Sequence, residues 1–269
     1  MRIPLCSGME RSGSTVAWQI VKSLIPRSRP LGWEPLCEVK DYDGHPVDWP
    51  LKRHQYMGGE RPIIYTYRHP IEAFLSLRRC FGSDAGLGLK QNTAKNQMEA
   101  DHDAMMHILN QLDVYRKYQL DMKAGRPVLM LRYEKYYAEP IQRITAISEF
   151  IEMKPPLLEH ELDMLLSYTD VRANAKRAKG RTFHQDRDHS SGMQAGHVNK
   201  KTFGEPSALL MQHATFVRAV LSAVNGENGE NDSLVSLRKM CESMGYEIPV
   251  PRKRNPHLFS FNSEKLFDF

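Results

Sequence analysis

The most informative segment of this 269-residue chain is Gly8-Met9-Glu10-Arg11-Ser12-Gly13-Ser14-Thr15. It has the frame of a nucleotide phosphate-binding loop, G-x-x-x-x-G-K-S/T, with Ser14 in place of the lysine. That lysine normally reaches the β- and γ-phosphates of ATP or GTP, so its absence argues against an NTPase or a kinase. The loop backbone and the start of a following helix still suit one phosphate. Because Arg11 is the only cation inside the loop, the pattern favours a nucleotide without a triphosphate.

The residues around this loop predict the strand and the helix that such a loop requires. Residues 3–7 form a short apolar run, which predicts a buried strand that ends at Gly8. Residues 15–24 carry Val16, Ile20 and Leu24 at helical spacing, and Pro26 follows them. The order strand, loop, helix turns the pattern match into a structural prediction.

Predicted strands and helices alternate along the next part of the chain. Strands are expected at residues 62–67 (PIIYTY) and 128–132 (VLMLR), with a shorter one near 36–39, and helices at 71–81, 96–124 (one helix or a helical pair) and 140–151. This alternation predicts a three-layer, P-loop-like α/β fold, with a central, mainly parallel sheet flanked by helices. Ligands of such sheets bind beyond the carboxyl ends of the strands, where we expect Gly8, Arg68 and Tyr133.

The C-terminal third is predicted to be mainly helical. Helices are expected at residues 157–166, 207–224 and 233–244, and Gly245 ends the last of them. Residues 173–205 are polar, basic and interrupted by glycines, which predicts a long loop that is either functional or disordered. No repeat or boundary divides the chain, so we expect a single domain over residues 1–269, with residues 249–269 as a C-terminal tail.

Composition indicates an ordinary globular protein, with 41% hydrophobic residues. No apolar run approaches the roughly 20 residues of a membrane span, and no signal pattern opens the chain. The cysteines lack metal-ligand spacing, so free thiols of a reducing compartment are expected at all four positions: Cys6, Cys37, Cys80 and Cys241. The net charge of +5 is dispersed along the chain. We therefore expect a cytoplasmic protein with neither a membrane nor a nucleic acid as its partner.

The loop is the first of three motifs that follow one another in the first half of the chain. The second is Tyr67-Arg68-His69-Pro70 with Ser76, and the third is Leu131-Arg132-Tyr133-Glu134 with Pro140. Together they resemble the sulfotransferases that use 3′-phosphoadenosine 5′-phosphosulfate (PAPS). In that family a Lys or Arg precedes the Ser-Gly of the 5′-phosphosulfate loop. An Arg at a strand end and a Ser eight residues later hold the 3′-phosphate, and an L-x-Y-E element lies beside the adenine.

The resemblance implies that PAPS is the sulfuryl donor and that 3′-phosphoadenosine 5′-phosphate (PAP) is the product. It assigns the 5′-phosphate to Arg11, Ser12, Gly13, Ser14 and Thr15, the 3′-phosphate to Arg68 and Ser76, and the adenine side to Tyr133. Residues 189–196 resemble the segment that closes over the 3′-phosphate through Gly192 and Gly196, with a flexible polar loop as the alternative. The chemistry agrees, because a guanidinium gives phosphate a bidentate contact and a serine hydroxyl adds a neutral donor.

Sulfuryl transfer needs a base for the acceptor and cations for the charge on the leaving oxygen. Alternate residues of a strand share a face, so Lys52 and His54 are expected to point together into the cleft. This K-x-H resembles the catalytic pair of cytosolic-type sulfotransferases, with His54 as base and Lys52 and Arg11 on the leaving phosphate. Carbohydrate-type relatives use a carboxylate instead, which keeps Glu34 and Asp48 as alternative bases. No metal is expected to be required.

The sequence therefore favours transfer of a sulfuryl group to a hydroxyl or an amine of a small molecule or glycan. Residues 82–113 and 173–189 are expected to select this acceptor, whose identity stays open, as does the oligomeric state. Two alternatives remain: a P-loop small-molecule kinase and a non-catalytic nucleotide-binding module on the same fold. Trp18 lies two residues beyond the place where many relatives stack a tryptophan on adenine, so that role has no assigned residue.

Overall fold

The computed structural model describes residues 3–24, 51–81, 97–152, 156–179, 193 and 239–246. Four parallel strands form one sheet in the order β2-β1-β3-β4. The strands are β1 (Leu5–Gly8), β2 (Leu51–Arg53), β3 (Ile63–Tyr67) and β4 (Val128–Arg132). Because all four run in the same direction, their carboxyl ends lie along one edge of the sheet.

The two faces of the sheet bury alternate residues of each strand, as the pleat requires. Leu5 and Ile63 belong to one hydrophobic core, whereas their neighbours Cys6 and Ile64 belong to a second. All four side chains have no exposed surface. The short apolar runs of the sequence are therefore strands covered on both sides, as expected for a parallel sheet between helices.

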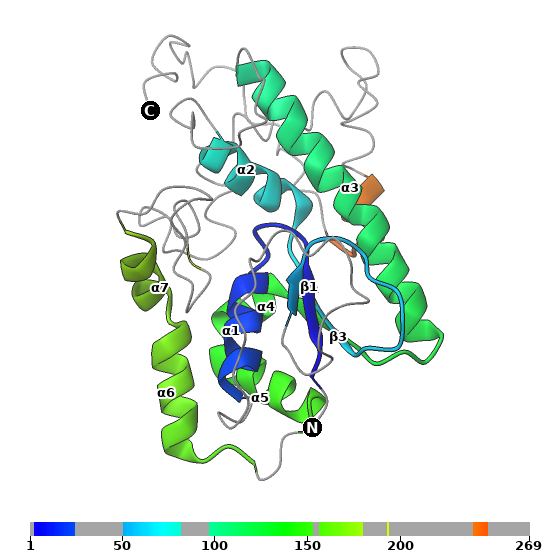
Figure 1. Cartoon of the computed structure of the whole chain (residues 1–269). Helices are drawn as coiled ribbons and strands as arrows, with labels where there is room; N and C mark the ends of the chain where they lie inside the picture. Colours follow the sequence, from blue (N-terminus) through cyan, green and yellow to red (C-terminus); the bar gives the residue numbers. More distant parts are fainter. Residues whose placement is uncertain are drawn as a thin grey trace, which may run out of the picture.

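Helices cover both faces, which gives the three layers visible in Figure 1. The first core contains residues of α2 (Pro70–Phe81) and α3 (Gln97–Lys123), and the second contains residues of α1 (Ser14–Leu24), α5 (Pro140–Phe150) and α6 (Glu159–Thr169). The remaining helices are α4 (Tyr133–Ala138), directly after β4, and α7 (Val171–Ala178). This arrangement confirms the predicted α/β fold with a parallel central sheet.

Two predictions of local structure need correction. The polar segment predicted as a loop from residue 173 begins with α7, because the Asp170 carboxylate caps that helix by accepting from the N–H groups of Arg172 (2.6 Å) and Ala173 (3.1 Å). Helix α6 starts at Glu159 and extends to Thr169, beyond the predicted end at residue 166.

The region predicted as one long helix or a helical pair is the single helix α3. The predicted helix at 207–224 lies outside the described residues.

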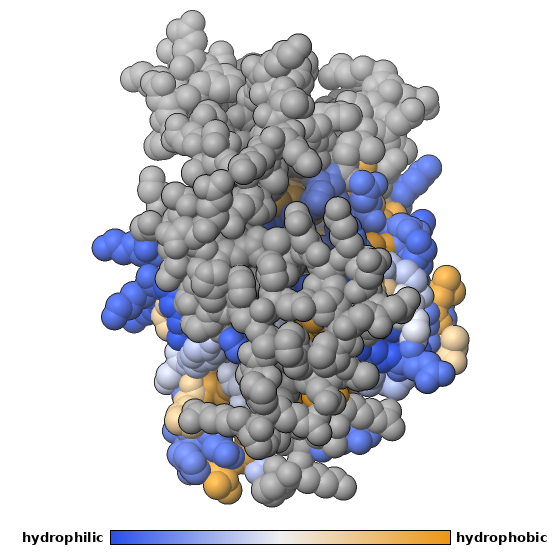
Figure 2. All heavy atoms as spheres, viewed as in Figure 1, coloured by the Kyte–Doolittle hydropathy of each residue, from blue (hydrophilic) through white to orange (hydrophobic). Residues whose placement is uncertain are grey.

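The C-terminal part that the structure describes packs on the first core. Residues 239–243 are helical, and Gly245 follows with a positive φ of 72°. Met240, Cys241, Met244 and Tyr246 are buried in the core that contains α2 and α3. Figure 2 shows that the described residues around the rim of its view are mostly hydrophilic, with separate hydrophobic spots.

Gly8 is the last residue of β1 and pairs with Thr66 of β3, which leads to a stability prediction. A Cβ at this position would lie 2.1 Å from Thr66 Oγ1 and 2.9 Å from the Thr66 backbone oxygen. We expect Gly8→Ala to lower the free energy of unfolding by about 1–3 kcal/mol, as overpacking in a core does. Urea denaturation would measure this.

Gly58→Ala is the matched control, because a Cβ there meets nothing within 4 Å. Its effect on stability should stay within about 0.5 kcal/mol. Equal stability of the two variants would contradict the steric argument.

Candidate functional site

The phosphate-binding loop lies between the end of β1 and the start of α1. Arg11 and Gly13 adopt positive φ angles of 63° and 84°. Positive φ is uncommon for a residue with a side chain, and such strain gathers at functional sites. A Cβ on Gly13 would lie 3.2 Å from Tyr133 Cδ2, so the loop also packs closely on the residue that opens α4. The loop is therefore a tight turn whose backbone packs on the start of α4.

The Ser12 hydroxyl anchors this loop to the neighbouring strand. It contacts the Thr66 hydroxyl at 2.7 Å and the Thr66 carbonyl oxygen at 3.0 Å, and it also bonds the Met9 carbonyl. Ser12 is only 2% exposed. Ser14 and Thr15 open α1, whose first N–H groups have no partner within the helix. The structure thus gives Ser12 an internal role, and α1 begins at Ser14.

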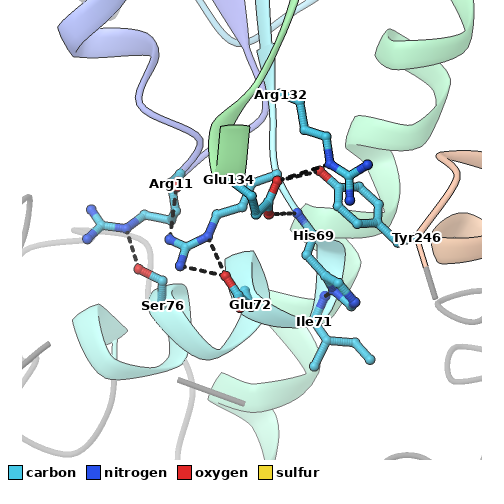
Figure 3. Close-up of polar contacts among 9 residues, drawn as sticks. Arg11, His69, Ile71, Glu72, Ser76, Arg132, Glu134 and Tyr246 are labelled. Carbon is cyan, nitrogen blue, oxygen red and sulfur yellow. Dashed lines mark hydrogen bonds and ion pairs between the residues drawn. The ribbon is translucent and has the colours of Figure 1, made fainter. Parts of the chain in front are cut away.

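Arg11 reaches from the loop to α2. Its Nε donates to Ser76 Oγ at 2.9 Å, which joins the two segments predicted to hold the 5′- and 3′-phosphates (Figure 3). Ser76 is 2% exposed and lies on the second turn of α2. The structure therefore brings Arg11 and Ser76 together directly.

Arg68 lies at the carboxyl end of β3 and is buried. Its Nε and Nη2 donate to Glu72 Oε2 at 3.2 and 2.9 Å, and its Nη1 donates to the Arg11 carbonyl at 3.2 Å. The guanidinium carbon lies 4.5 Å from the centre of the Tyr133 ring. Burial raises the pKa of Glu72 to about 7, and the adjacent Arg68 opposes that rise. Arg68, Ser76 and Tyr133 therefore surround one region beside the loop.

Sequence reasoning missed Glu72, although its spacing carried a signal. It lies four residues after Arg68, a separation at which a carboxylate and a guanidinium meet on one side of a helical turn. Its carboxylate orients the guanidinium and leaves other N–H groups of Arg68 for a ligand. Glu72 is thus a partner of the predicted phosphate-binding arginine.

Lys52 and His54 meet as predicted from their alternation. Lys52 Nζ lies 2.9 Å from His54 Nε2, and His54 Nδ1 lies 2.7 Å from the Gly8 carbonyl. A carbonyl only accepts, so Nδ1 carries the proton and Nε2 is the acceptor. Burial and the charge of Lys52 lower the pKa of His54 to about 4. The imidazole is therefore neutral at physiological pH, with its basic nitrogen toward Lys52.

A second ionisable pair, Glu10 with His107 of α3, lies next to Lys52 and His54. The two side chains form an ion pair, and they are 23% and 47% exposed. Burial would raise the pKa of Glu10, but the hydrogen bond from His107 and the nearby His54 and Lys52 lower it to about 2. The bond to Glu10 raises the pKa of His107. The sequence placed His107 within residues 82–113, the segment expected to select the acceptor, and gave no reason to pair it with the loop.

Trp18 packs in the interior of the fold. It is 6% exposed and belongs to the second core, and Lys22 Nζ lies 5.0 Å from its ring centre. Cys6 and Cys241 are buried free thiols, and burial raises the pKa of each to about 12. Four predicted site residues lie outside the described residues, namely Glu34, Asp48, Gly192 and Gly196, as does Cys37.

Two kinds of feature are absent from the described segments. Across these segments no group of three or more His, Cys, Asp or Glu side chains could hold a metal ion. No helix in the same part of the chain combines the length and the apolar character needed to cross a membrane.

Comparison with known proteins identifies the class of fold. No family model matches the chain, and no curated protein does. Among solved structures, the chain is similar to mouse sulfotransferase SULT7A1 complexed with PAP, with a TM-score of 0.54 and 13% identity over 90% of this chain and 89% of that one. The chain thus has a sulfotransferase-like fold. A structural similarity at 13% identity shows the fold alone.

The Glu10–His107 pair predicts how stability depends on pH. The lowered pKa of Glu10 gives a contribution that is complete above about pH 4.5 and is lost as the pH falls toward 2. The raised pKa of His107 gives a second contribution to stability. This contribution is complete below pH 6.5, the ordinary pKa of a histidine, and is lost as the pH rises through the folded-state pKa of His107. The pair should therefore stabilise most between about pH 4.5 and 6.5.

His107→Gln tests this by thermal unfolding at several pH values. The melting temperature should fall relative to the unaltered chain by roughly 2–4 °C near pH 5.5, and the difference should shrink toward pH 9. Lys117→Gln removes the Lys117–Asp113 ion pair from the same helix, a pair that contains no histidine, and should give a difference that does not vary with pH. A His107→Gln difference that does not vary with pH would contradict the pairing.

Proposed function

We propose that this chain is a PAPS-dependent sulfotransferase. One observation carries the proposal: a phosphate-binding-type loop without the NTPase lysine is joined through Arg11 both to Ser76 and to a second cationic position at Arg68. Two anion positions side by side suit a nucleotide phosphorylated on both its 3′ and 5′ sides. The fold it shares with a PAP-bound sulfotransferase supports this choice.

The residues present fit the phosphates of PAP and PAPS. Gly13, Ser14 and Thr15 would hold the 5′-phosphate through backbone N–H groups and the start of α1. Arg68, oriented by Glu72, would hold the 3′-phosphate together with Ser76. Gly192 and Gly196 remain candidates for closing the 3′ side. PAPS supplies the sulfuryl group, and no metal is invoked in the proposal.

His54 and Lys52 would carry the transfer. The acceptor oxygen or nitrogen forms a bond to sulfur, and the bond from sulfur to the bridging oxygen of the 5′-phosphosulfate breaks. The electron pair of that bond stays on the phosphate of PAP, and the acceptor proton passes to His54 Nε2. Lys52 and Arg11 would neutralise the charge that grows on the leaving oxygen. We propose a small-molecule or glycan acceptor and a cytoplasmic location.

Nucleotide binding is the first prediction of this proposal. PAP should raise the melting temperature of the protein, because a ligand that binds only the folded state stabilises it by mass action. ATP with Mg²⁺ should have no comparable effect, since the loop lacks the lysine that holds β- and γ-phosphates. Arg68→Ala should abolish the shift, which a thermal-shift titration would measure.

Lys135→Ala serves as the control, because its side chain lies over Tyr136 on α4 outside the proposed phosphate contacts. It should retain the PAP shift. Stabilisation by ATP with Mg²⁺ alone would overturn the proposal and support the kinase alternative.

The role of His54 gives a separate kinetic prediction. His54→Ala should lower kcat by about 10²–10⁴-fold, the usual contribution of a general base, while PAP affinity stays unchanged. Because the pKa of His54 is about 4, kcat/KM should be flat from pH 6 to 8 and fall only as the pH drops toward 4 and Nε2 becomes protonated. PAP release from PAPS with an acceptor panel would measure both.

His160→Ala, on the exposed side of α6, is the matched histidine control and should leave kcat unchanged. Full turnover by His54→Ala would show that another group is the base, with Glu34 and Asp48 the next to test. Strong PAP binding without turnover of any acceptor by the unaltered chain would favour the non-catalytic module.

A further inference from the structure

Glu134 joins the strand end that carries Arg68 to the C-terminal part of the chain. Its Oε1 accepts from the backbone N–H of His69 at 2.8 Å, and its Oε2 accepts from the Tyr246 hydroxyl at 2.9 Å (Figure 3). His69 directly follows Arg68, so this carboxylate holds the peptide group between the two residues. A hydrogen bond to a charged acceptor is among the stronger ones in a protein. The orientation of Arg68 therefore depends on the position of Glu134.

Tyr246 is held rigidly where it meets Glu134. Its ring centre lies 4.2 Å from the Arg132 guanidinium carbon and 4.8 Å from the His69 ring centre, and the Tyr67 ring meets it edge-on at 6.3 Å. The residue is only 5% exposed. Burial raises the pKa of Tyr246, so its hydroxyl keeps the proton that it donates. The side chain is thus a fixed donor.

The segment around Tyr246 also packs on α2, the helix that carries Ser76. Met240 and Met244 belong to the same buried core as Phe74 and Leu77 of α2. Segment 239–246 therefore contacts both elements that provide the proposed 3′-phosphate residues, although it is more than 160 residues away in sequence.

We propose that Tyr246 and Glu134 are positioning residues that set Arg68 for the 3′-phosphate, so that segment 239–246 forms part of the nucleotide site. This inference rests on the proposed function. Arg132 Nε lies 3.5 Å from Glu134 Oε2, the oxygen that Tyr246 occupies. Without the hydroxyl, the carboxylate can turn toward Arg132 and away from the His69 N–H. A displaced Arg68 guanidinium would bind the 3′-phosphate less well, while the fold would be retained.

Tyr246→Phe tests this with two ligands, measured by calorimetric titration. PAP affinity should fall by about threefold to tenfold, the size expected for one hydrogen bond. Affinity for 5′-AMP, which lacks the 3′-phosphate, should not change. Glu134→Gln should also lower PAP affinity and leave 5′-AMP affinity unchanged. The melting temperature of each variant records whether it is folded.

Tyr56→Phe is the matched control, because Tyr56 also donates its hydroxyl to a carboxylate, that of Asp121, with 3.2 Å to each oxygen. This contact lies near Arg126, at the opposite end of the sheet, and its loss should leave both affinities unchanged. Unchanged PAP affinity in Tyr246→Phe, or an equal loss for PAP and 5′-AMP, overturns the positioning role alone. Failure of the unaltered chain to bind PAP overturns the proposed function and this inference together.

Discussion

The site depends on the buried guanidinium of Arg68. A buried charge is costly unless it is paired and hydrogen-bonded, and Arg68 meets this requirement through Glu72, the Arg11 carbonyl and the Tyr133 ring. These contacts come from α2, the phosphate-binding loop and the start of α4. One side chain thus ties together the three motifs that lie far apart in the sequence. The geometry that would receive a bisphosphate is consequently built into the protein itself.

The carboxylates around this centre are each bonded to a partner within the protein, which would limit their repulsion of the anionic ligand that we propose. Glu72 is bonded to Arg68, Glu134 to a backbone N–H and Tyr246, and Glu10 to His107. Each negative charge is therefore directed to a partner within the protein. A planar guanidinium has five N–H groups, so Arg68 retains donors beyond those that Glu72 and Arg11 engage. This is how acidic residues and an anion-binding site can share one edge of the sheet.

The sequence was sufficient for the elements whose pattern is local. The apolar runs at β1, β3 and β4 and the glycine pattern of the loop depend on neighbouring residues, and the meeting of Lys52 with His54 follows from strand alternation. Glu10 with His107, and Glu134 with Tyr246, could not be predicted, since each pair joins residues about 100 apart. Such contacts are decided by how α3 and segment 239–246 pack on the sheet. The start of α7 was missed for a different reason. The polar and basic residues of this segment predicted a loop, although Asp170 caps a helix there.

The contact between Lys52 and His54 links nucleotide binding to base strength in the proposed reaction. As the structure stands, Lys52 bonds the nitrogen that would take the acceptor proton, and its charge helps to lower the pKa of His54 to about 4. An anionic phosphosulfate beside the loop would attract the Lys52 ammonium and offset its charge. Movement of the ammonium would make His54 Nε2 accessible. The offset charge would let the pKa of the imidazole rise toward the range in which a histidine is an effective base, so both changes would favour proton transfer. The same lysine would then stabilise the leaving oxygen, so one movement would prepare the base and the leaving group together.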